Sequence, residues 1–361
     1  MPKTLRIALA ASLLALPSLA AEATREQVSR YFGGWFSVCP ATKVAVVAEG
    51  EIALFGYEAY RVERQCDLKH RNEVAVTLVD RAKNEVFVGE VLHSDDRGAR
   101  AFAADRDIPV LEAAMHDAYG VPVSIAVEPD SRGPLVPIRL SLRQAESAVA
   151  TLPGYVSQDG ATVLLGEFRP LDGDPAAFRE HLLAESPGVR PEKGSFFVTA
   201  FLDFQCEKCR QRTPEVREFV GKRGGALEIR FLPLVKAHNW AFAAAENAAA
   251  LSNISPSLYL EYEEALFPRA GQMNAAVARE IAIDVAEAAG VREAFAAQLS
   301  SGRARERVLR DIGLALRLGL NSTPVFFYGG AFLTSEPGIV EDFIGGRQAG
   351  PPTTPARGAG R

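Results

Sequence analysis

The amino-acid sequence predicts an α/β protein in two parts, an N-terminal region of α+β modules and a C-terminal α/β domain. Two observations support this prediction. In the N-terminal region, groups of short strand-like runs follow each of two helical patterns. From about residue 195 onward, the strand-like runs become continuously apolar and are separated by long helical segments, which is typical of buried central strands.

Residues 1–20 have the pattern of a signal peptide. Lys3 and Arg6 precede an apolar run at 7–16 that is too short to span a bilayer, and small residues follow it. An uncleaved membrane anchor is the alternative interpretation. We therefore expect a protein that is exported, to the periplasm or an equivalent compartment, and soluble once the leader is removed.

Residues 24–93 and 105–170 are each predicted to form a module with a helix followed by antiparallel strands. The two modules end in similar sequences, "VTLVDRAKNEVFVGEV" and "PGYVSQDGATVLLGEF". This similarity indicates a duplicated unit of about 70 residues, although two hairpins can also resemble each other by chance. The predicted helices are 23–32 and 108–119, and the predicted strands are 43–48, 52–62, 73–80, 85–92, 121–127, 135–141, 154–158 and 161–168.

Residues 171–194 are rich in Pro, Gly and charge and are predicted to be a linker with one short helix. The domain at 195–345 contains strand candidates at 195–204 and 227–235. A long helical stretch, two short strands around a Gly-Gly turn and a last helix follow them. The tail at 346–361 is too poor in apolar residues to fold and is expected to be disordered.

The composition excludes several classes of function. The chain has 361 residues, 48% of them apolar and 24% charged, and a net charge of −5, which suits a soluble protein of two or three domains. It has no basic patch with interleaved aromatic residues, so a nucleic-acid partner is not expected.

Half of the four cysteines lie in the stretch "FLDFQCEKCR", where Cys206 and Cys209 directly follow an apolar run. On the first turn of a helix, two cysteines at this spacing have their sulfurs within disulfide distance. Cys206 would lie at the helix N-terminus, which stabilises a thiolate, and Cys209 would be shielded and able to resolve a mixed disulfide. A purely structural disulfide is the alternative. No second pair completes a zinc site and the histidines are scattered, so neither a metal nor a cofactor is expected.

Residues 195–345 resemble the DsbA-like thioredoxin-fold thiol–disulfide oxidoreductases, which are exported proteins. The cysteine pair carries this resemblance together with Pro214 and the segments "FLPLVKAHNWAFAAAENAAAL" and "LGLNSTPVFFYGG". The resemblance implies a thioredoxin fold with a helical insertion. It also implies a cis peptide bond at Thr323–Pro324, where an extended substrate segment would pair beside the cysteines. A trans proline that begins an edge strand is the alternative.

The N-terminal region is distantly similar to the dimerisation domains of DsbC/DsbG-type isomerases. This similarity is carried by the helix-plus-strands pattern and by "DGATVLLGEF" at 159–168. It implies a homodimer formed through residues 24–170. The same residues contain no cluster of catalytic type, so we expect them to serve in self-association or client binding.

The residues between the two cysteines are expected to tune the pKa of Cys206. DsbA-type proteins often have Pro-His there, whereas this chain has Glu207 and Lys208. The Glu207 carboxylate would oppose a thiolate and the Lys208 ammonium would favour it. We therefore expect the pKa of Cys206 to lie near the thioredoxin value of about 7. Asp203 could also tune Cys206, although a carboxylate before a helix can equally be a cap, and His238 is interpreted as a capping or surface residue.

The remaining cysteines, Cys39 and Cys66, are predicted to form a structural disulfide in the first module. An exported protein can keep such a bond, and closing the loop would contribute about 3–4 kcal/mol in the chain-entropy model.

These observations predict an exported enzyme that exchanges disulfides with cysteine-containing protein clients and is recycled by a redox partner protein. A dimeric disulfide isomerase or reductase is the alternative within the same fold. A chaperone-like protein, which binds clients and has an incidental disulfide, is the alternative from another class.

Overall fold

A computed structural model describes residues 19–38, 44–54, 56–66, 73–93, 108–129, 133–145, 147–158, 160 and 162–347. Most of the expected signal peptide and nearly all of the expected disordered tail lie outside these residues. Among the described residues, no helix has the length and apolar character needed to cross a membrane.

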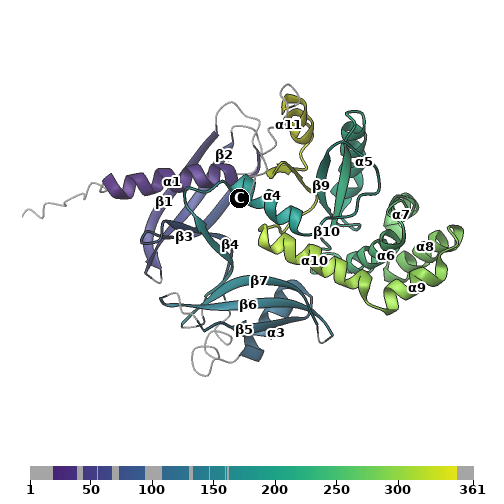
Figure 1. The fold of residues 1–361 in the computed structure, drawn as a ribbon, viewed down its shortest axis with the longest axis horizontal. Coiled ribbons are helices and arrows are strands. Elements are labelled where there is room, and N and C mark those ends of the chain that lie inside the picture. Colours follow the sequence, from purple (N-terminus) through teal and green to yellow (C-terminus); the bar gives the residue numbers. More distant parts are fainter. Residues whose placement is uncertain are drawn as a thin grey trace, which may run out of the picture.

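The N-terminal region forms one antiparallel sheet of eight strands in the order β1-β2-β3-β4-β8-β7-β6-β5. A helix followed by four strands occurs twice along the chain, and the two groups meet where β4 pairs with β8 (Figure 1). The elements are α1 (Leu19–Trp35), β1 (Val44–Leu54), β2 (Tyr57–Cys66), β3 (Glu73–Asp80), β4 (Glu85–His93), α3 (Ile108–Tyr119), β5 (Val123–Val127), β6 (Leu135–Gln144), β7 (Ser147–Ser157) and β8 (Thr162–Pro170).

One strand of this sheet is much longer than its sequence indicates. The prediction covered only 154–158, whereas β7 begins at Ser147. The first five residues of β7 are exposed or half-buried, so the apolar signal that marks a strand is weak there.

The C-terminal domain contains a four-stranded sheet in the order β10-β9-β11-β12. β9 and β10 are parallel, and β11 is antiparallel to both of its neighbours, β9 and β12. A block of helices separates β10 from β11 and packs beside the sheet (Figure 1). The elements are β9 (Phe197–Leu202), α5 (Glu207–Gly221), β10 (Ala226–Phe231), α6 (Ala241–Ile254), α7 (Leu258–Leu266), η1 (Phe267–Gln272), α8 (Ala275–Ala288), α9 (Arg292–Ser300), α10 (Arg303–Arg317), β11 (Val325–Tyr328), β12 (Ala331–Thr334) and α11 (Ile339–Arg347).

The segment expected to be a linker is packed between the two parts. Its helix α4 (Pro175–Glu185) buries Phe178 and Leu182 in an apolar cluster that includes residues of α1, β2–β4, β9 and β11. Asp174 caps this helix by accepting a hydrogen bond from the backbone N–H of Ala176 at 2.8 Å. The two parts of the chain therefore share a core instead of being joined by an exposed connection.

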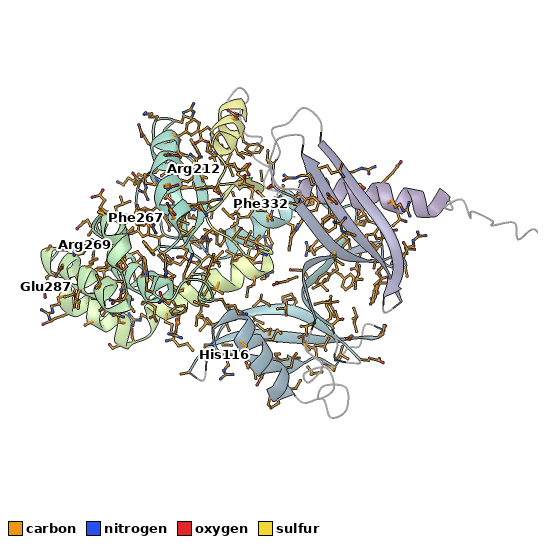
Figure 2. All side chains as sticks on the ribbon, turned by 180° about the vertical axis from the view of Figure 1, so that it is seen from behind. His116, Arg212, Phe267, Arg269, Glu287 and Phe332 are labelled. Atoms are coloured by element: carbon orange, nitrogen blue, oxygen red, sulfur yellow. The ribbon has the colours of Figure 1, made fainter. Side chains whose placement is uncertain are left out.

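Arg179 on α4 is 2% exposed and binds backbone carbonyls from both parts. It donates hydrogen bonds of 2.7 Å to the carbonyls of Gly34 and Trp35 at the end of α1, and to that of Gly330 in the turn between β11 and β12. Burial lowers the pKa of Arg179 to about 10, so the side chain remains charged at neutral pH. Nearby, the backbone N–H of Val38 donates to the backbone carbonyl of Phe332 on β12, and Figure 2 shows Phe332 beside the purple lobe.

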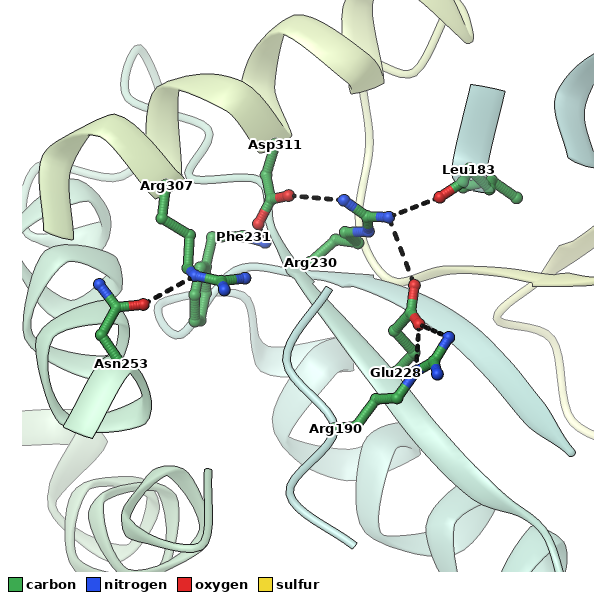
Figure 3. Close-up of polar contacts among 8 residues, drawn as sticks. All are labelled: Leu183, Arg190, Glu228, Arg230, Phe231, Asn253, Arg307 and Asp311. Carbon is green, nitrogen blue, oxygen red and sulfur yellow. Dashed lines mark hydrogen bonds and ion pairs between the residues drawn. The ribbon is translucent and has the colours of Figure 1, made fainter. Parts of the chain in front are cut away.

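A buried charge network connects β10 to α10 and to the end of α4 (Figure 3). Arg230 donates to Asp311 at 3.1 Å, to Glu228 at 3.3 Å and to the carbonyl of Leu183 at 2.9 Å. The Arg230 and Asp311 side chains are 1% and 2% exposed, and a second cation, Arg190, binds Glu228 from the surface at 2.6 Å. Because buried charges without partners are costly, this network defines how α10 sits on the sheet.

Candidate active site

The two cysteines lie where β9 runs into α5. Cys206 is the N-cap residue of α5, with an extended backbone conformation, and is only partly buried. Cys209 is inside the first turn of the helix and is 1% exposed. This is the placement that the spacing predicted, with one sulfur at the helix mouth and the other shielded.

The segment before β11 completes the site from a distant part of the chain. The Thr323–Pro324 peptide bond is cis, as the resemblance implied. The Cys206 sulfur lies 3.4 Å from the carbonyl oxygen of Thr323, to which the protonated thiol donates, although the two residues are 117 positions apart. β9 and β11 are neighbouring strands, so their pairing brings the two segments together.

The pKa of Cys206 is lowered to about 5. The largest cause is the hydrogen bond from the Cys209 thiol, and partial burial opposes it. The backbone N–H groups of Cys209 and Lys208 and the Thr323 side chain lower the pKa further. At neutral pH the Cys206 sulfur is therefore a thiolate, the form that acts as a nucleophile.

This pKa corrects the expectation of about 7, and the reason lies in which groups face the sulfur. The Glu207 carboxylate accepts a hydrogen bond from the Gln211 side chain at 3.1 Å, along the helix. Lys208 lowers the pKa through its backbone N–H group. The charges of the intervening residues, on which the prediction depended, are thus outweighed by hydrogen bonds from Cys209 and Thr323.

The pKa of Cys209 is shifted in the opposite direction, well above its usual value. Burial is the main cause, and the hydrogen bond with Cys206 and the charge on that residue add to it. The Cys209 sulfur also accepts a hydrogen bond from the backbone N–H of Asp203 at 3.4 Å. The pair thus has one ionised and one protonated thiol, which suits a nucleophile followed by a resolving residue.

Sequence reasoning missed a polar contact that fixes the loop before the cysteines. Asp203 is 1% exposed, and one of its carboxylate oxygens accepts the backbone N–H of Gln205 at 2.7 Å. The other oxygen accepts the backbone N–H of Leu234 at 2.8 Å and lies 2.7 Å from Nδ1 of His238. Because β9 and β10 are parallel neighbours, the residues that follow them meet at one edge of the sheet, and this is the signal that could have paired Asp203 with His238.

Two further expectations concern sites away from the pair. Cys39 lies outside the described residues and the side chain of Cys66 is not described, so their disulfide stays a prediction. Within the described part of the chain, no group of three or more His, Cys, Asp or Glu side chains is arranged to hold a metal ion.

The comparisons with known proteins concern mainly the C-terminal domain. Residues 192–342 match the family model described as "Thioredoxin". No curated protein sequence matches the chain significantly. The match and the strand order together confirm the thioredoxin fold with a helical insertion that was predicted for 195–345.

Several solved structures are similar to this chain. The thiol-disulfide exchange protein alpha-DsbA2 from Wolbachia pipientis is 15% identical, with a TM-score of 0.40, over 49% of this chain and 98% of the other. The catalytic domain of Proteus mirabilis ScsC is 18% identical, with a TM-score of 0.37, over 47% and 92% of the two chains. MdbA, a thiol-disulfide oxidoreductase from Actinomyces oris, is 15% identical, with a TM-score of 0.33, over 44% and 82%.

Proposed function

We propose that this chain, whose residues 192–342 form a thioredoxin-fold domain, is a thiol–disulfide oxidoreductase that acts on cysteines of other exported proteins. The observation that carries the proposal is the unequal cysteine pair. Cys206 is accessible at a helix N-terminus with a pKa of about 5, and Cys209 is buried and protonated directly behind it. A purely structural disulfide has no need of this difference.

The reaction proceeds by two exchange steps. In the reducing direction, the Cys206 thiolate attacks one sulfur of a substrate disulfide, and the other substrate sulfur leaves as a thiolate that takes a proton from solvent. Cys209 then loses its proton and attacks the Cys206 sulfur, which releases the second substrate thiol and leaves a Cys206–Cys209 disulfide. Two electrons pass from the cysteine pair to the substrate, and the oxidising direction is the reverse of these steps.

The segment at Thr323 and Pro324 is proposed to bind the substrate backbone. The Thr323 carbonyl already lies 3.4 Å from the Cys206 sulfur, so a peptide that extends alongside it would bring its own sulfur to the nucleophile. Main-chain pairing of this kind accepts many sequences, which suits an enzyme with diverse protein clients.

The low pKa of Cys206 supports the oxidising direction more than the sequence did. A stabilised thiolate favours the reduced form of the enzyme and is a better leaving group, so the enzyme disulfide becomes more oxidising. An enzyme of this kind must then be reoxidised by a separate redox partner protein. Export, which the leader-like residues 1–20 predict, would place it where disulfides persist.

The test is disulfide exchange by the full mature protein, measured both as insulin reduction with a thiol reductant and as oxidation of a dithiol peptide. Cys206→Ser should reduce both activities to the uncatalysed level. Cys209→Ser should accumulate a mixed disulfide between Cys206 and the client. The double variant Cys39→Ser/Cys66→Ser is the matched control, because it removes the other two cysteines of the chain and leaves the Cys206–Cys209 pair, so exchange should be retained at a temperature where the variant is folded. Exchange at the normal rate by Cys206→Ser would overturn the proposal.

A further inference from the structure

The eight-stranded sheet has an internal two-fold relation at its centre. β4 and β8 are each nine residues long, and each has a glycine at its fifth position, within the similar sequences "VFVGEV" and "VLLGEF". They pair antiparallel so that the first residue of each strand faces the last residue of the other. The two central glycines, Gly89 and Gly166, face each other.

This pairing has the form of an interface between two identical molecules. In a two-fold interface, if residue i of one copy faces residue j of the other, then j of the first faces i of the second. Here Phe87 faces Phe168, and their counterparts in the repeat, Leu164 and Val91, also face each other. The two repeats of one chain therefore pair as two copies of a homodimer would.

The close approach at the centre is the same from both sides. A Cβ atom added to Gly89 would lie 2.1 Å from the carbonyl oxygen of Leu165, and one added to Gly166 would lie 2.1 Å from that of Val88. Both glycines have positive φ angles, 150° and 146°. A two-fold axis requires each local environment to occur twice, and this one does.

On one face of the sheet, the side chains around the centre follow the same relation. On the opposite sides of the axis, Val86 and Val88 correspond to Val163 and Leu165, and all four are buried. On the other face of the sheet, Phe168 is the centre of an aromatic group. Its ring centroid lies 5.3–5.6 Å from those of Tyr57, Phe87 and Tyr155.

We infer that residues 19–170 are a built-in dimer, in which the second module occupies the place that a second copy of the chain would take. The protein is then a monomer with one cysteine pair. This replaces the homodimer through residues 24–170 that the sequence led us to expect. Among the described residues, β1 and β5 form the two edges of the sheet, at its opposite ends, and β5 has only five residues.

The position of the C-terminal domain agrees with a monomer because this domain contacts both modules. Arg179 and Phe332 connect it to the end of α1 in the first module. In the second module, a Cβ added to Gly120 would lie 2.4 Å from the Val235 side chain, in the loop that follows β10. Helix α10 crosses the join, since it contacts β4 as well as β6, β7 and β8. One catalytic domain thus covers the region that a second domain would need.

The main test is the molar mass of the full mature protein, measured by light scattering and sedimentation over a wide range of concentrations. The inference predicts the mass of one chain throughout. A stable dimer over that range would overturn it. Exchange activity is measured separately, so failure of this inference leaves the proposed function standing, and the converse also holds.

A variant tests whether the pairing of β4 with β8 is what joins the two modules into one sheet. Gly166→Val would place side-chain atoms against the backbone of β4 and should expose two strand edges, seen as concentration-dependent association or loss of the folded state. Gly133→Val is the matched control, because Gly133 also has a positive φ angle, of 61°, but has nothing within 4 Å of an added Cβ. A Gly166→Val protein that stays monomeric and as stable as the control would count against the inference, and the wild-type mass decides it if the variant does not fold.

Discussion

The cysteine pair and the centre of the N-terminal sheet are both places where distant segments approach closely, but they are built in opposite ways. At the sheet centre the same residue, glycine, occurs on both strands in the same environment. At the cysteine pair the same residue occurs twice in different environments, one accessible and ionised and the other buried and protonated. The matching glycine environments hold β4 and β8 together. The different cysteine environments give one reactive thiolate and one protonated thiol that can resolve a mixed disulfide.

The two places are also sensitive to different kinds of substitution. The sheet centre is made of backbone atoms, so only the size of a side chain matters there. The reactivity of Cys206 depends on hydrogen bonds from Cys209, Lys208 and Thr323, so changes of chemistry matter even when size is kept. The following variants test this difference, beginning with the largest expected effect.

Gly89→Ala should cause the largest loss of stability. The added Cβ would meet backbone atoms of Leu165 and Gly166 at 2.1–2.9 Å, and backbone cannot move aside as a flexible side chain can. We expect the free energy of unfolding in urea to fall by at least about 3 kcal/mol. Gly56→Ala, which has a φ angle of 77° but open space around it, should lose only about 1–2 kcal/mol. Equal losses in the two variants would mean that the close approach of β4 and β8 is unimportant.

Arg179→Met should weaken the connection between the N-terminal sheet and the C-terminal domain, with a smaller loss of stability than Gly89→Ala. The substitution keeps much of the apolar volume but removes three hydrogen bonds to the carbonyls of Gly34, Trp35 and Gly330. Because those carbonyls lose a charged donor, we expect a loss of about 1–3 kcal/mol in urea unfolding. Arg292→Met is the control, since the ion pair of Arg292 with Glu287 is exposed and should be worth less than about 1 kcal/mol. A loss in Arg179→Met no greater than in the control would show that Arg179 does not connect the parts.

Cys209→Ala tests how far the low pKa of Cys206 depends on the neighbouring thiol. The Cys209 thiol is the largest cause of the low Cys206 pKa, so its loss should raise that pKa above about 5, as measured by the ultraviolet absorbance of the thiolate or the rate of alkylation against pH. An unchanged midpoint would contradict this account.

The low pKa of Cys206 also predicts how the stability of the reduced protein depends on pH. The pKa of Cys206 is lower in the folded state than in the unfolded chain, so between about pH 5 and the unfolded value of about 8.5 the unfolded state binds more protons. Relative to Cys206→Ser, the reduced protein should therefore gain stability as the pH rises through this window and lose it as the pH falls toward 5. Urea unfolding of both proteins at several pH values measures this, and a constant difference would be the contrary result.

The parts of the molecule that could be predicted from sequence are those with a local signal. The cysteine pair follows a continuous apolar run, the Thr-Pro step precedes a strand, and the two similar sequences around Gly89 and Gly166 mark a repeat. Each signal lies within a few neighbouring residues. The helical insertion was predicted in the same way, from a long stretch of helical pattern.

The parts that could not be predicted depend on contacts between distant residues. No periodicity shows that Gly89 faces Gly166, that Asp203 binds His238, or that the Thr323 side chain lowers the pKa of a cysteine far back in the chain. The segment at 171–194 has the composition of a linker, yet its helix is buried because α1 and the C-terminal sheet cover Phe178. Composition describes what a segment can do alone, and here the tertiary contacts decide.

The smallest expected effect is that of Glu207→Gln, which removes a charge next to Cys206 and keeps the size of the side chain. From the sequence, the Glu207 carboxylate is expected to oppose the Cys206 thiolate, because it is the next residue. In the structure it binds the Gln211 side chain, and the main causes of the Cys206 shift are other groups. Removing the negative charge should still favour the thiolate, so the pKa should fall only slightly below about 5.

Thr323→Val provides the contrast, because it removes the hydroxyl and keeps the shape. The Thr323 Oγ1 atom is buried, and the Thr323 side chain is among the groups that lower the pKa of Cys206. Loss of the hydroxyl should raise the pKa of Cys206, in the direction opposite to Glu207→Gln and by a larger amount. Titration of the thiolate in both variants and the wild type compares the two. A larger shift from Glu207→Gln would show that the neighbouring charge, and not the distant hydroxyl, governs this cysteine.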